Sequence, residues 1–136
     1  MGSVAVTDAE FAAALGSGWR AVRQLVRRAA VATPEEASRL RTEWDSAMDD
    51  GDDLNAAADA VHDAWRLSRR ACIGVGAWDA ISRGIDADQV GTAALIAASC
   101  AARATMVEDL VGQHGLTAAH VELARRPWCA VFGDIG

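Results

Sequence analysis

Residues 87–111 have the sequence ADQVGTAALIAASCAARATMVEDLV, and this stretch decides the fold. Its first half is apolar on almost every side, whereas a helix on a protein surface carries only one apolar stripe. Ala favours the helical backbone because it loses no side-chain entropy on entering a helix. We therefore expect residues 87–111 to form one helix at the centre of an all-α domain.

Capping residues mark where the other helices begin. Thr7, Thr33 and Thr117 each precede an apolar repeat. A threonine hydroxyl in this position accepts a hydrogen bond from an otherwise unpaired backbone amide. Asp86 is expected to cap the central stretch in the same way. With the helical spacing of apolar side chains, these caps predict five helices, over residues 8–32, 34–48, 53–84, 87–111 and 118–126.

Glycine and proline determine two further details of this plan. The apolar spacing continues past Gly74 and Gly76, so we expect one long helix over residues 53–84, kinked near the two glycines. Pro127 lacks a backbone donor and is expected to end the last helix, which leaves residues 128–136 irregular. Long helices with short connections predict a single domain, an antiparallel bundle of four to five helices.

The charge of the chain is concentrated in one acidic segment. The net charge is −6, and all 13 basic residues are Arg, as is typical of a GC-rich bacterial genome. Residues 33–63 hold ten carboxylates against Arg39 and Arg41, a net charge of −8. Such a surface repels the phosphates of nucleic acids and favours a basic protein partner. The ten residues are Glu35, Glu36, Glu43, Asp45, Asp49, Asp50, Asp52, Asp53, Asp59 and Asp63.

Three features of the sequence indicate the cellular compartment of the protein. The cysteines, Cys72, Cys100 and Cys129, are odd in number and widely spaced, which argues against a disulfide framework. The longest apolar run, residues 90–102, is too short for a membrane span. The N-terminus has no basic region of the kind that begins a signal peptide. We expect a cytoplasmic protein with reduced thiols and no membrane partner.

Tryptophan is the main aromatic residue, with five copies against two Phe and no Tyr. Small-molecule sites are usually apolar or aromatic pockets with a few polar groups. An indole suits such a wall because it is large and carries one hydrogen-bond donor. We therefore predict a pocket for a small aromatic or hydrophobic ligand, with Arg side chains at its rim to bind an anionic group. The predicted residues are Trp44, Trp65, Trp78, Arg66 and Arg69.

A set of carboxylates on the second and third predicted helices offers a metal site as an alternative. Its members are Glu36, Glu43, Asp59 and Asp63. The arrangement resembles the all-α nucleotide pyrophosphohydrolases of the MazG type, which hold Mg²⁺ with E-x-x-E and E-x-x-D motifs on neighbouring helices. Here Arg39 stands three residues after Glu36, and His62 stands three residues after Asp59. The resemblance implies a small Mg²⁺-dependent hydrolase.

Residues 107–128 suggest another alternative, a helix-turn-helix. Gly115 stands at the expected turn, and Val121 stands where the second helix would pack back. Glu122 and the net negative charge oppose an approach to phosphates. This reading predicts a DNA-binding regulator. Independently, Ala-rich helices with exposed apolar faces suggest a homodimer.

No motif in the sequence names a reaction. We expect a non-enzymatic helical binding protein that needs no cofactor. It would either inhibit a basic protein partner through the acidic surface of residues 33–63 or bind a small ligand in the Trp-lined pocket. The metal-dependent hydrolase and the DNA-binding regulator remain as alternatives.

Overall fold

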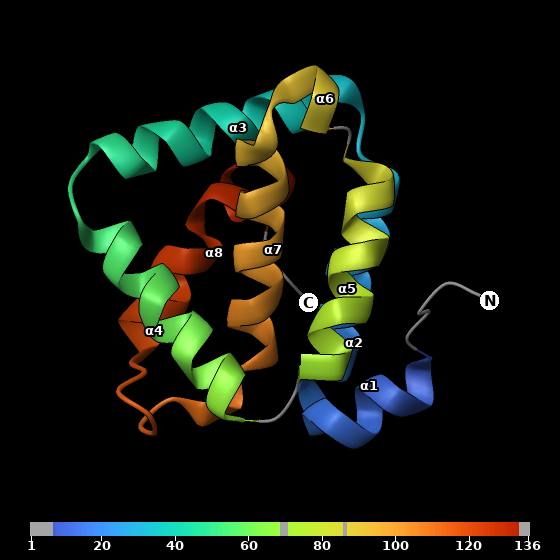
Figure 1. Cartoon of the computed structure of the whole chain (residues 1–136), viewed down its shortest axis with the longest axis vertical. Coiled ribbons are helices and arrows are strands. Elements are labelled where there is room, and N and C mark those ends of the chain that lie inside the picture. Colours follow the sequence, from blue (N-terminus) through green and yellow to red (C-terminus); the bar gives the residue numbers. More distant parts are fainter. Residues whose placement is uncertain (1–6, 69–70, 86, 134–136) are drawn as a thin grey trace.

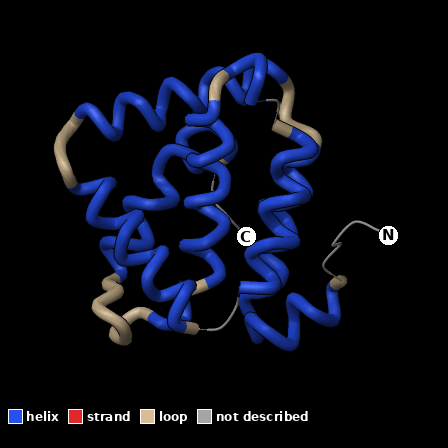
Figure 2. The backbone as a smooth tube through the Cα atoms, in the orientation of Figure 1, coloured by secondary structure: helices blue, strands red, loops and turns tan. Residues whose placement is uncertain are grey.

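The computed structural model describes residues 7–68, 71–85 and 87–133, and most of these residues are helical (Figures 1 and 2). No strand occurs within these ranges, so the predicted all-α, bundle-like fold is confirmed. Two 3₁₀ turns, η1 (Gly16–Gly18) and η2 (Glu108–Leu110), accompany the α-helices. The α-helices are α1 (Asp8–Leu15), α2 (Trp19–Ala30), α3 (Pro34–Asp49), α4 (Asp53–Leu67), α5 (Ala71–Gly84), α6 (Ala87–Val90), α7 (Thr92–Met106) and α8 (Ala118–Phe132).

Helix α7 lies at the centre of the molecule (Figure 1). It contacts α8 and α4 on one side, α5 and α2 on the other, and α3, which crosses one end of the bundle. This confirms the predicted central helix over residues 92–106. No helix in the described ranges combines the length and the apolar character needed to cross a bilayer.

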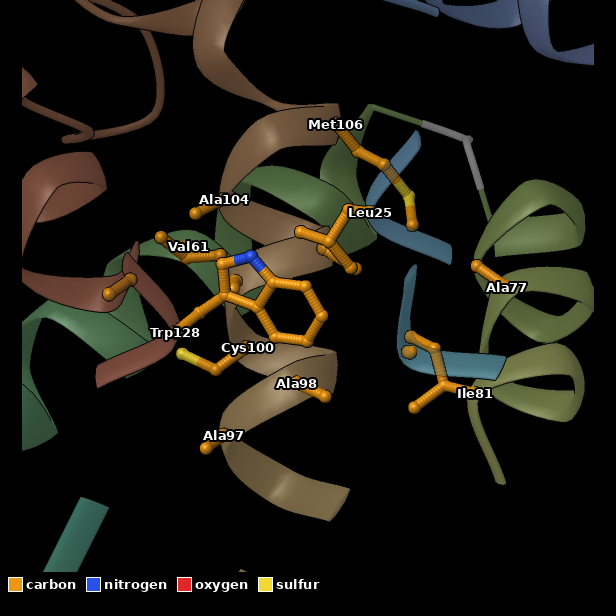
Figure 3. Close-up of a cluster of buried hydrophobic side chains, with 14 of the residues drawn as sticks. Leu25, Val61, Ala77, Ile81, Ala97, Ala98, Cys100, Ala104, Met106 and Trp128 are labelled. Atoms are coloured by element: carbon orange, nitrogen blue, oxygen red, sulfur yellow. The ribbon is translucent and has the colours of Figure 1, made fainter. Parts of the chain in front are cut away.

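Small side chains let the neighbouring helices approach α7 closely. Its buried residues are mostly alanines, namely Ala94, Ala97, Ala98, Ala101, Ala102 and Ala104. Larger side chains from the surrounding helices fill the space around them, among them Leu25, Val61, Ile81 and Trp128 (Figure 3). The core is therefore a ring of large side chains around a narrow central helix.

Two of the predicted caps form complete capping boxes. The Thr33 hydroxyl accepts from the Glu36 amide, and the Glu36 carboxylate accepts from the Thr33 amide. At Thr117 the partner is His120, whose Nδ1 accepts from the Thr117 amide at 3.2 Å. Histidine thus takes the place of the usual Glu or Gln. The predicted cap at Asp86 lies outside the described residues.

The prediction of one continuous helix over residues 8–32 is wrong, because the structure has two helices in this segment, α1 and α2. Gly16 has φ 63° and ψ −139°, a region that is essentially restricted to glycine. The chain therefore leaves the helix at Gly16, passes through η1 and restarts at Trp19 as α2. A helical spacing of apolar residues on both sides of the break concealed it.

The single helix predicted over residues 53–84 is also wrong, and the break is not at the glycines. Helix α4 ends at Leu67, and α5 contains both Gly74 and Gly76. At the end of α4 the Ser68 hydroxyl donates to the Trp65 carbonyl at 2.8 Å, and such a bond competes with continuation of the helix. Glycine in a helix costs about 1 kcal/mol, which the packing of α5 on α2 and α7 offsets.

The helix predicted over residues 87–111 is shorter than expected at both ends. Gly91, at φ 82°, separates the single turn of α6 from α7. Helix α7 then ends at Met106. The Val107 amide closes its last turn by donating a hydrogen bond to the backbone carbonyl of Arg103. Glu108 and Asp109 follow at once, and negative charge is unfavourable at the C-terminal end of a helix.

Pro127 does not end the last helix. Helix α8 continues through it to Phe132, and Pro127 itself is fully buried. Trp128, predicted to lie in an irregular tail, is 2% exposed and packs on Phe132 with ring centroids 4.1 Å apart. A proline inside a helix costs about 3 kcal/mol. The packing of α8 on α7, α4 and α3 offsets that cost.

Candidate functional site

Arg103 contacts two of the tryptophans that the sequence analysis assigned to a pocket, Trp65 and Trp78. It lies on α7, and its guanidinium carbon is 4.9 Å from the ring centroid of Trp65 on α4. The same carbon is 6.0 Å from the ring centroid of Trp78 on α5. Both distances allow cation–π attraction. The guanidinium thus lies against one indole from α4 and one from α5. Figure 1 shows α7 between these two helices.

A hollow opens beside the guanidinium. It has about 10 Å³ of free space, which is the room that one water-sized group requires. The hollow can therefore receive a single oxygen atom but not a whole ligand. Its lining residues are Ala77, Trp78, Ile81, Ser99, Ala102, Arg103 and Met106.

Two buried polar atoms at this place have no partner among the described residues. Ser99 is 5% exposed, it lines the hollow, and its Oγ makes no hydrogen bond. The Nε1 of Trp65 is likewise buried and unpaired. A buried polar group without a partner costs about 1–3 kcal/mol. A group that enters the hollow and bonds to Ser99 would recover that free energy.

The charge of Arg103 is not neutralised by its neighbours. Within the described residues the side chain of Arg103 makes no ion pair and no hydrogen bond. Cys100 lies on the same helix, but burial raises the pKa of its thiol to about 11, and the charge of Arg103 only partly opposes that rise. Cys100 is therefore a neutral thiol at pH 7 and supplies no counter-charge.

An apolar surface extends from the hollow along α7. Ile96 precedes Ser99 by three residues and Arg103 by seven, so the three side chains lie on one face of the helix. Ile96 is 42% exposed and Trp78 is 40% exposed. A ligand with its polar end at Arg103 can therefore rest its apolar part on these two side chains.

The other predicted pocket residues lie elsewhere or are not described. Trp44 is buried in the core on α3 and does not line the hollow. Arg66 is exposed and pairs with Asp63 at 3.7 Å. Arg69 lies outside the described residues. Arg103, Ser99 and Met106 were not predicted, although Arg103 could have been found as the only charged residue within α7.

The structure does not gather the four carboxylates predicted for Mg²⁺. Glu36 lies in the first turn of α3, about 20 Å along that helix from the turn into α4. Its carboxylate accepts from the Thr33 amide and from Arg28, and these contacts lower its pKa. Within the described ranges no group of three or more His, Cys, Asp or Glu side chains is placed to hold a metal ion.

The geometry around residues 107–128 differs from the predicted helix-turn-helix. The helix expected before the turn ends at Met106, and a 3₁₀ turn and a loop follow it. The two arginines of the expected recognition helix are engaged in ion pairs. Arg125 pairs with Glu108 at 2.6 Å, and Arg126 pairs with Glu122 at 3.4 Å. These cations are thus partly neutralised by the protein itself.

The acidic surface of residues 33–63 is accessible. All its carboxylate residues are exposed except Glu36, which is half-buried. Three of the ten have ion pairs, with Arg28, Arg41 and Arg66 as partners. The other seven make no ion pair within the described part of the chain.

Comparison with known proteins assigns no relative to this chain. No protein-family model matches it, and no curated protein or solved structure matches it either. The geometry around Arg103 is therefore the main guide to function.

Proposed function

We propose that this protein is a non-enzymatic binding protein for a small organic carboxylate with an apolar or aromatic body. One observation carries the proposal. The Arg103 guanidinium lies against Trp65 and Trp78 without an ion pair. It does so beside a hollow in which the Ser99 hydroxyl is buried and unpaired.

A carboxylate fits this arrangement better than other small groups. Arg presents its donors in one plane, and they match the two oxygens of a carboxylate. The indole rings restrict the orientation of that plane and exclude water from one side of it. One carboxylate oxygen can enter the hollow and accept a hydrogen bond from Ser99. The apolar body of the ligand would then lie on Trp78 and Ile96.

The side chains nearest to this site favour binding over covalent chemistry. A nucleophilic serine needs a base within hydrogen-bond reach, and the Ser99 hydroxyl has no partner among the described residues. A nucleophilic cysteine needs a lowered pKa. Burial instead raises the pKa of the Cys100 thiol to about 11.

The proposal is tested by calorimetric titration with octanoate and with its neutral analogue octanamide. We expect octanamide to bind at least about tenfold more weakly, because it cannot make the charge-assisted hydrogen bonds. Arg103→Gln should remove the difference between the two ligands. Arg66→Gln is the matched control, because Arg66 is an exposed Arg on α4 that pairs with Asp63. Equal effects of the two variants, or no binding of octanoate, would disprove the proposal.

A second candidate function is the binding of a basic protein. It is supported by the seven carboxylates of residues 33–63 that make no ion pair in the described part of the chain. We expect such a complex to weaken as salt rises, because exposed charges are screened. Replacement of Asp49, Asp50, Asp52 and Asp53 by Asn should abolish it. Arg103→Gln should leave it intact, so the two functions can be separated.

A further inference from the structure

The first turn of α8 depends on a hydrogen bond that only a neutral histidine can accept. The Thr117 amide donates to Nδ1 of His120 at 3.2 Å, and the His120 amide donates to the Thr117 hydroxyl at 3.1 Å. These two bonds form the capping box of α8. A neutral imidazole has one nitrogen that donates and one that accepts, whereas a protonated imidazole has two donors. Protonation of His120 would therefore place two N–H groups against each other.

Helix α8 also lacks the negative charge that lies at the start of α1 and α3. Asp8 and Glu10 lie in the first turn of α1, and Glu35 and Glu36 lie in the first turn of α3. The first turn of α8 holds no acidic residue. The N-terminal end of a helix carries partial positive charge, which disfavours a cation. A protonated His120 thus loses a hydrogen bond and meets an unfavourable charge at the same time.

The capping box of α3 has the same pattern of bonds but should respond differently to pH. There the Glu36 carboxylate accepts from the Thr33 amide at 3.0 Å. That hydrogen bond lowers the pKa of Glu36 below its ordinary value of 4.5, so the carboxylate remains an acceptor from pH 8 down to pH 5. Histidine, by contrast, is the side chain that changes charge in this range. Acidification should therefore affect the box of α8 and spare that of α3.

No neighbouring charge compensates for a proton on His120. Helix α8 packs on α3, α4 and α7, and within the described residues no side chain of these helices forms an ion pair, hydrogen bond or ring contact with His120. On α8 itself Arg126 pairs with Glu122, and Arg125 pairs with Glu108 of η2. The other titratable or charged residues on these elements are Glu35, Glu36, Arg39, Arg41, Glu43, Asp45 and Asp49 on α3, Asp53, Asp59, His62, Asp63 and Arg66 on α4, Cys100 and Arg103 on α7, and Asp109 on η2.

We propose that His120 makes the start of α8 an acid-sensitive joint. As the pH falls from 8 to 5, protonation of His120 breaks its bond to the Thr117 amide, and the first turn of α8 opens. Few contacts oppose this opening, because residues 111–115 and 117–119 are exposed. The rest of α8 stays packed, since Val121, Ala124 and Trp128 are buried.

The sign of the effect on stability follows from the unfolded state. The unfolded chain has no capping box to lose, so protonation of His120 favours unfolding, and stability falls as the pH falls. His120 is half-buried and not enclosed, so a proton can reach it from solvent without prior unfolding. The joint does not depend on the ligand proposed at Arg103.

Thermal melting at pH 8 and at pH 5 tests the proposal with the variant His120→Gln. Glutamine also completes a capping box, but it has no proton to gain. Loss of a cap shifts the melting temperature of a domain of this size by about 3 °C, so the wild-type protein should lose about 3 °C more than His120→Gln on acidification. His62→Gln and His114→Gln replace exposed histidines and are the matched controls, which should behave as the wild type does.

Amide NMR spectra over the same pH range locate the change within the molecule. The Thr117 amide proton should move upfield as its hydrogen bond is lost, whereas the Thr33 amide proton, bonded to Glu36, should stay in place. In His120→Gln neither signal should titrate. The proposal is overturned if His120→Gln loses as much stability in acid as the wild type, or if a control variant abolishes the loss. It is also overturned if the Thr117 signal stays fixed or the Thr33 signal moves with it.

Discussion

Gly84 on α5 lies directly against the backbone of Ala29 on α2. A β-carbon built on Gly84 would overlap the carbonyl oxygen of Ala29 and the Cα atom of Ala30. These atoms belong to the backbone, so they cannot move aside as the end of a flexible side chain can. The approach of α5 to α2 therefore depends on a glycine at this position.

Gly84→Ala should destabilise the protein although alanine is the better helix former. Overpacking costs about 1–3 kcal/mol, and here the two helices would have to separate. The effect can be measured by urea denaturation followed by circular dichroism. Gly18→Ala is the control, since a β-carbon there would meet no atom within 4 Å. A Gly84→Ala protein as stable as the Gly18→Ala protein would contradict the close approach.

Ser99→Ala should stabilise the free protein and weaken binding. The Ser99 hydroxyl is buried without a partner, and removal of such a group is expected to raise the free energy of unfolding by about 1 kcal/mol. The same change removes the proposed donor to the carboxylate. Thermal unfolding and calorimetric titration with octanoate give the two quantities. A lower melting temperature would instead indicate that an ordered water bonds to Ser99.

Stability should fall as the pH rises above about 9, and Cys100 should account for the fall. Burial raises the pKa of Cys100 from 9.0 to about 11. Between these values the folded chain keeps the proton and the unfolded chain loses it, so alkaline pH favours unfolding by roughly 2–3 kcal/mol. The chain has no Lys and no Tyr, so few other groups titrate in this range.

Urea denaturation at a series of pH values from 8 to 11, under reducing conditions, measures this effect. Cys100→Ala should flatten the pH dependence even if the variant is less stable overall. Cys129→Ala should retain it, because Cys129 is only half-buried. An unchanged slope in Cys100→Ala would assign the alkaline transition to another group.

In acid, Glu36 should contribute to the loss of stability. The Thr33 amide and Arg28 lower its pKa below the ordinary value of 4.5. Its contribution is therefore complete above pH 4.5 and is lost as the pH falls through the lowered pKa of the folded state. Glu36→Gln, which retains a capping side chain, should reduce this acid dependence. Glu35→Gln, at an exposed neighbouring position, should have little effect.

The fold could be predicted where one local signal was sufficient. The apolar sequence of residues 92–106 correctly predicted the central helix. The threonine caps correctly predicted the starts of α1, α3 and α8. The ends of helices were less predictable because they depend on competing interactions. Ser68 and Gly91 end helical segments, whereas Pro127 does not, since the burial of Trp128 and its neighbours offsets the cost of the proline.

The candidate site could be predicted only in part. Trp65 and Trp78 were identified, but nothing in their spacing indicates that Arg103 lies against both. The three residues come from three helices, and their proximity is set by how α4 and α5 pack on α7. Arg66 and Arg69 were preferred because they are close to the tryptophans in sequence, which is a poor guide to contact between helices.

The alanine-rich surface of α7 limits which amino-acid substitutions this protein can accept during evolution. Its neighbours rest on methyl groups and backbone, so almost any larger residue at Ala97, Ala98, Ala101 or Ala104 would push a whole helix outward. Compensating changes would have to occur in several helices at once. We therefore expect these positions to accept little beyond Gly, Ala, Ser and Cys, while the surrounding large residues exchange more freely. The small size of the α7 side chains is therefore the property of this protein that evolution can least easily alter.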